Sequence, residues 1–129
     1  MTTTIAALDP AGALSVLRTA VGAGTWIHPG LSWRTFGFGP IPDDPRTVLI
    51  SRMFGIRDLG LGLAVRHPSP PVRRAALQVG IALDVADVAA SVIAVRRGAP
   101  ATILLGVTAG AAFFVGLGLA ALNQDSSAA

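Results

Sequence analysis

The chain has 129 residues, of which 52% are apolar and only 13% are charged, and its mean hydropathy is positive. Soluble domains carry about 25% charged residues, so this composition argues against a water-soluble domain and predicts a single integral membrane domain over residues 1–129. Every basic residue is arginine and every acidic one is aspartate. Cysteine is absent, which excludes disulfides and cysteine metal sites. A net charge of +3 on scattered arginines does not indicate nucleic-acid binding.

The first apolar segment spans residues 11–27, with Asp9 as the expected N-cap and Pro10 at the first helical position. Arg18 lies at its centre, so this is the weakest predicted span. Two alternatives are open: the helix could tilt, or Arg18 could pair with an aspartate from another helix. No basic residue precedes the segment, so we interpret it as a retained helix rather than a secretory signal.

Residues 28–44 form a predicted loop that is rich in glycine, proline and aromatic residues. Tryptophan favours the headgroup region of a bilayer, so we interpret this loop as an interfacial anchor. The alternative is a lid over a cavity between the helices. The aromatic residues on which both interpretations depend are Trp26, Trp33, Phe36 and Phe38.

The second predicted helix spans residues 45–66 and begins with the same signal as the first, Asp44 followed by Pro45. Its apolar part is just long enough to cross a bilayer. Charged residues nevertheless occur inside it, at Arg52, Arg57 and Asp58, among glycines that permit close approach of another backbone, at Gly55, Gly60 and Gly62.

The third predicted helix spans residues 70–97, after a proline-rich hinge and with Ser69 as the N-cap candidate. Asp84 and Asp87 lie three residues apart, hence on one helical face, in the middle of an apolar stretch. Gly80 and Ser91 extend this small, polar face, which we expect to point into a bundle. The opposite face is expected to point toward lipid and carries Leu77, Ile81, Val85, Val88 and Val92.

The fourth predicted helix spans residues 101–122 and contains no charge, and a tight turn with Gly98 as its left-handed residue joins it to the third helix. So short a turn requires an antiparallel hairpin. Small residues at four-residue spacing, from Gly106 and Gly110 onward, predict close packing within the chain or against a neighbouring protomer. Residues 123–129 are expected to be a disordered tail. The predicted fold is therefore all-α, a four-transmembrane-helix bundle, multi-pass in the inner (plasma) membrane.

The expected interior of this bundle contains three arginines and three aspartates, namely Arg18, Arg52, Arg57, Asp58, Asp84 and Asp87. The equal numbers favour a structural ion-pair network in a non-catalytic membrane protein, because an unpaired charge at bilayer depth is costly. We expect Arg57 and Asp58 to meet Asp84 and Asp87 at matching helix depths. The alternative is a small proton-coupled carrier or a small-molecule-binding membrane protein that uses Asp84 and Asp87.

Enzymatic activity is the least favoured class. The sequence contains no cysteine nucleophile and no HExxH motif, and His28 and His67 lie at predicted helix ends beside prolines. Asp84 and Asp87 alone are too few ligands for a hard cation. We therefore expect no catalytic residue, metal or cofactor. The expected partners are the lipid bilayer and either a second copy of the chain or another membrane protein.

The run Arg52-Met53-Phe54-Gly55-Ile56-Arg57-Asp58, continued to Gly62, resembles the R-x-x-G-x-R-[DE]-x-x-x-G signature of small bacterial four-helix membrane proteins of unknown function. The acidic pair Asp84 and Asp87, a following arginine pair and a glycine-rich last helix resemble the same family. The resemblance implies a four-helix membrane domain, and it implies no activity or cofactor.

Overall fold

The computed structural model describes residues 9–128, which form five helices and no sheet, so the prediction of an all-α fold is confirmed. The helices are α2 (Pro10–Ile27), α3 (Pro29–Thr35), α4 (Pro45–Ala64), α5 (Pro70–Arg96) and α6 (Ala101–Ala128). Among the described residues, α5 and the stretch Ala101–Ser127 of α6 are long and apolar enough to cross a membrane.

Side-chain caps fix where the helices begin. The carboxylate of Asp9 accepts a hydrogen bond from the Gly12 amide, and that of Asp44 accepts one of 3.0 Å from the Arg46 amide. Each cap is followed by a proline at the first helical position, as predicted. Ser69 occupies the N-cap position of α5 without a side-chain bond, and Gly98 follows that helix with a φ of +103°, which glycine adopts without strain.

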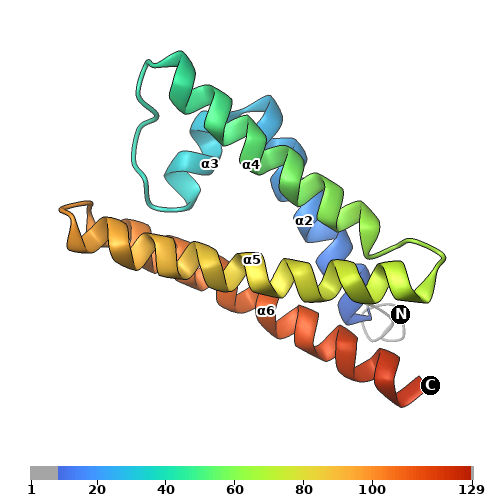
Figure 1. Ribbon diagram of the computed structural model, residues 1–129. Helices are drawn as coiled ribbons and strands as arrows, with labels where there is room; N and C mark the ends of the chain where they lie inside the picture. The colour runs from blue at the N-terminus through green and yellow to red at the C-terminus, as the bar shows by residue number, and fades with distance from the viewer. Residues whose placement is uncertain (1–8, 129) are drawn as a thin grey trace, which may run out of the picture.

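The long helices form two antiparallel pairs that diverge like the arms of a V (Figure 1). One arm is α2 with α4, and the other is the α5–α6 hairpin that the short turn predicts. Glycines bring the backbones of the first arm together: a methyl group on Gly22 would lie 2.5 Å from the Gly55 carbonyl oxygen. Helix α2 begins and helix α6 ends where the arms meet.

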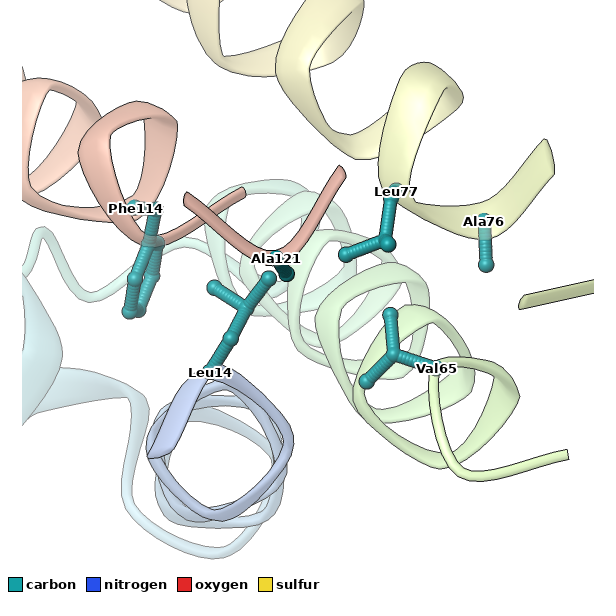
Figure 2. Close-up of a cluster of buried hydrophobic side chains, with 6 residues drawn as sticks. All are labelled: Leu14, Val65, Ala76, Leu77, Phe114 and Ala121. Atoms are coloured by element: carbon teal, nitrogen blue, oxygen red, sulfur yellow. The ribbon is translucent and has the colours of Figure 1, made fainter. Parts of the chain in front are cut away.

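The apolar core occupies the junction of the arms. All four long helices contribute to it, through Leu14, Val65, Ala76, Leu77, Phe114 and Ala121 (Figure 2). Leu77 belongs to the face that we expected to point toward lipid, so that assignment is wrong for this residue. The reason is position along the helix, because near its beginning α5 is enclosed by the other arm and only further along does it separate from it.

Two further expectations for irregular structure are wrong. Residues 29–35 of the predicted loop form the short helix α3, whose first turn is capped by His28, since its Nδ1 atom accepts the Leu31 amide at 3.0 Å. The predicted disordered tail is helical through Ala128. There the hydroxyls of Ser126 and Ser127 donate to carbonyls one turn earlier, so polar side chains continue the helix rather than end it.

Candidate functional site

Arg18 is the central group of a buried ion-pair network between the two arms. It is 2% exposed, and its guanidinium binds Asp84 of α5 through both of its terminal nitrogens. Its Nη1 atom also donates to Asp58 of α4 at 3.3 Å. Gly80 makes room for this arrangement, because a methyl group there would lie 3.2 Å from Nη2 of Arg18. Arg18, which lies in the weakest of the predicted spans, thus joins α2, α4 and α5.

A second ion pair lies beside the first. Arg57 of α4 donates from Nη2 to Asp87 at 2.6 Å and from Nη1 to the other carboxylate oxygen at 3.2 Å. Its Nη2 atom also lies 3.7 Å from Oδ1 of Asp58. Asp84 and Asp87 therefore meet two different arginines, one from each helix of the other arm. This agrees with the expected meeting of Arg57 with an aspartate of the third predicted helix.

Arg52 does not belong to the network, although we expected it there. It is exposed, and its Nε atom donates to the carbonyl of Trp26 at 3.1 Å, at the end of α2. Five residues separate Arg52 from Arg57, which turns its side chain about 140° away around the helix. The network of the described residues consequently holds two arginines and three aspartates rather than three of each.

A cavity of about 390 Å³ lies between the two arms, beside the ion-pair network, and Phe114 of the apolar core is one of its lining residues. All five helices contribute to its walls, α2 through Thr25, and the walls are mostly apolar. Asp58, Asp84 and Asp87 line it, whereas neither Arg18 nor Arg57 does. The carboxylates therefore separate the cavity from the guanidinium groups that pair with them.

Residues 33–38, hereafter the aromatic strap, span from one arm to the other. Nε1 of Trp33 donates to the hydroxyl of Ser51 on α4 at 2.8 Å. At the other end, Phe36 packs against Gly106 and Gly110 of α6, and the Gly37 carbonyl accepts from Thr102 at 2.8 Å. The GxxxG pair of α6 thus receives the strap instead of another helix.

The strap supplies most of the aromatic wall of the cavity, through Trp33, Phe36 and Phe38. The position of these residues agrees with our alternative interpretation, a lid over a cavity. Trp26, in contrast, lies outside the cavity with 47% of its surface exposed, which fits an interfacial anchor. Sequence reasoning singled out three of the cavity's aromatic residues, but it did not identify Phe54 and Phe114, which also line the cavity, and could not tell which rings turn inward.

The hydroxyl groups around the cavity already have partners within the protein. Thr25 and Ser32 bond to each other at 2.6 Å, Ser51 donates to the Thr47 carbonyl, and Ser91 donates to the Val88 carbonyl. No group of three or more potential metal ligands is found among residues 9–128. The arrangement can therefore hold a largely apolar molecule next to an acidic surface.

No protein-family model, curated protein or solved structure matches the chain.

Proposed function

We propose that the protein is a four-span integral membrane protein that binds a small molecule in the cavity between its two arms, without catalysing a reaction. The cavity is the observation that carries the proposal. Its volume of about 390 Å³ falls within the range of about 300–1,000 Å³ that is typical of ligand pockets. Like those pockets, it combines mostly apolar walls with a small number of polar groups, namely three aspartates and four hydroxyl side chains.

The distribution of exposed side chains supports four spans rather than two. Large apolar side chains lie exposed on α2 and α4 as well as on α5 and α6, for example Leu17, Ile56, Val85 and Leu105. The arginines and aspartates near the middle of α2, α4 and α5 point inward and pair with one another. Lipid is the solvent that suits such an exterior, and ion pairing is what makes Arg18 and Arg57 tolerable at that depth. The resemblance to small bacterial four-helix membrane proteins supports the same placement, in the inner (plasma) membrane.

The chemistry of the site favours binding over catalysis. Asp84 and Asp87 each face a guanidinium that holds both carboxylate oxygens. Both oxygens of each carboxylate are thus engaged in a structural contact. The network therefore borders the cavity and keeps the two arms in register.

Native mass spectrometry of the protein purified with its lipids tests the proposal. We expect a bound small molecule in the wild type and its loss in Ala94→Leu, which adds bulk to a side chain that lines the cavity. Ala86→Leu is the matched control, because Ala86 is exposed on α5 and does not line the cavity. A wild type with no bound molecule, or equal loss in both variants, would contradict the proposal.

A second candidate function, a subunit of a larger membrane assembly, is favoured by α6. Ala112, Gly116 and Ala120 lie exposed at four-residue spacing, and nothing lies within 4 Å of a methyl group placed on Gly116. Such a face suits close packing of a second helix, from another copy or another membrane protein. Cysteine crosslinking at Gly116 in membranes tests it, and a monomeric product in native membranes would argue against it.

A further inference from the structure

The charges around the cavity do not cancel. Arg18 and Arg57 contribute two positive charges, and Asp58, Asp84 and Asp87 contribute three negative ones. Among the described residues, the charged residues that line the cavity are these three aspartates, and α6 contributes no charge to its walls. One carboxylate is left without a counter-charge of its own, and an unmatched carboxylate at bilayer depth is costly.

Asp58 is the carboxylate that is matched least well. Only its Oδ1 atom faces the arginines, at 3.3 Å from Arg18 and 3.7 Å from Arg57. Both of these arginines hold another aspartate with two nitrogens. No contact between its Oδ2 atom and an arginine is found among the described residues. Asp58 is 2% exposed and is one of the residues that line the cavity, so the surplus charge lies at the wall of a space that a ligand can fill.

The other walls suit a positive charge on an apolar body. The face of an aromatic ring attracts cations, and tryptophan does so most strongly. Arg57 and Arg18 already lie over Phe54 and Phe114, at 4.4 Å and 4.6 Å from the ring centroids. The strap residues Trp33 and Phe38 pack together at 5.0 Å, and the hydrogen bond from Trp33 to Ser51 fixes the indole. These rings line the cavity with no arginine over them in the described structure.

We propose that the cavity binds a monovalent organic cation with an apolar body, of the aryl ammonium class, with Asp58 as its counter-charge and the aromatic strap around its apolar part. This inference rests on the proposed function, because it names the ligand class of the same cavity. A small metal cation fits less well, since hard cations require several oxygen ligands and the walls beyond the aspartates are apolar.

Two probes of nearly the same shape separate charge from size. Benzyltrimethylammonium is the cation, and neopentylbenzene is its neutral counterpart, with carbon in place of nitrogen. Trp33 reports binding by fluorescence in a Trp26→Phe background, because the chain has two tryptophans and only Trp33 lines the cavity. The protein is titrated in lipid nanodiscs as the parent, as Asp58→Asn, and as Asp43→Asn, which changes an exposed loop aspartate.

We expect the parent to bind the cation more tightly than the neutral probe. Asp58→Asn should weaken cation binding by about tenfold, which corresponds to about 1.4 kcal/mol, and should leave the neutral probe unaffected. Asp43→Asn should behave as the parent. The comparison of the two probes on the parent needs no variant, so it remains informative even where Asp58→Asn folds poorly.

Other outcomes overturn the inference. Equal binding of both probes by the parent shows a cavity without charge preference, and the proposed function then stands while the cation proposal falls. If a phospholipid co-purifies in the cavity and the cation does not displace it, the cation proposal likewise falls while the proposed function stands. Absence of binding by either probe also rejects the cation, and the search for a bound molecule by native mass spectrometry then decides the proposed function separately.

Discussion

At the scale of single residues, Arg18 does more than any other side chain to join the arms. It lies at the centre of α2 and binds carboxylates on both α4 and α5. Together with Leu14 and Asp58 it is among the most completely buried side chains. A guanidinium can do this because its planar fork presents several donors at once, so one side chain can satisfy two carboxylates.

Replacing Arg18 by methionine should lower the free energy of unfolding by about 3–5 kcal/mol, because buried Asp84 loses its guanidinium partner and Asp58 loses the nearer of its two. Adding Asp84→Asn to Arg18→Met should recover part of that loss. Thermal unfolding in detergent of the two single variants and the double variant measures the coupling. Strictly additive losses would show that Arg18 and Asp84 do not stabilise each other.

Helix geometry explains most of the contacts in this network. It also explains why the prediction that Arg52 belongs to the network was wrong. Arg57 and Asp58 are neighbours and so project about 100° apart, which lets one meet Asp87 and the other meet Arg18. Arg52 lies five residues from Arg57 and faces the end of α2 instead. Counting charges in apolar segments identified the candidates, but only the angular position of each residue decides which of them meet.

At the scale of helices, glycine decides how closely the first arm packs. Gly22→Ala should lower the free energy of unfolding by about 1–3 kcal/mol, because its methyl group would press on the backbone of α4 at Gly55 and Leu59. Gly24→Ala is the matched control in the same helix, where nothing lies within 4 Å of an added methyl group. We expect it to be neutral or slightly stabilising, and equal losses in thermal unfolding would contradict close packing at Gly22.

A second glycine pair tests the attachment of the aromatic strap. Gly106→Ala should push the strap away from α6, because the new methyl group would overlap the Phe36 carbonyl. Quenching of Trp33 fluorescence by acrylamide, in a Trp26→Phe background, should then increase. Gly116→Ala lies in open space on the same helix and should leave quenching unchanged. If both variants quench like the parent, the strap does not depend on this contact.

The sequence predicts the long helices better than the segments between them. Asp-Pro pairs mark the beginnings of α2 and α4, and Gly98 marks the turn after α5, because caps and turns depend on local chemistry. The short helix α3 was missed, since its seven residues are too few for a hydrophobic period to show. The same local signals say nothing about the partner of Gly106, which is determined by tertiary contact.

At the scale of the whole molecule, the structure combines three adjoining parts between its arms. The apolar core lies at the junction, the ion-pair network adjoins it with Arg18 over the ring of Phe114, and the cavity and its aromatic strap border the network. On α5, seven residues, roughly 10 Å of helix, separate Leu77 of the core from Asp84 of the network. The sequence predicted the polar layer and the antiparallel α5–α6 hairpin. It could not predict the cavity, because the space depends on how far two separately packed arms diverge.

We propose that α5 borders lipid on one side and a ligand-accessible cavity on the other. Single cysteines at neighbouring positions test this directly, because the chain has no native cysteine. Ala89 and Ala90 are both exposed at nearly the same depth, but only Ala90 lines the cavity. Both variants are treated in intact membranes with a small cationic methanethiosulfonate reagent. We predict modification of Ala90→Cys and protection of Ala89→Cys in lipid. Equal modification of both, or protection of both, would contradict the account.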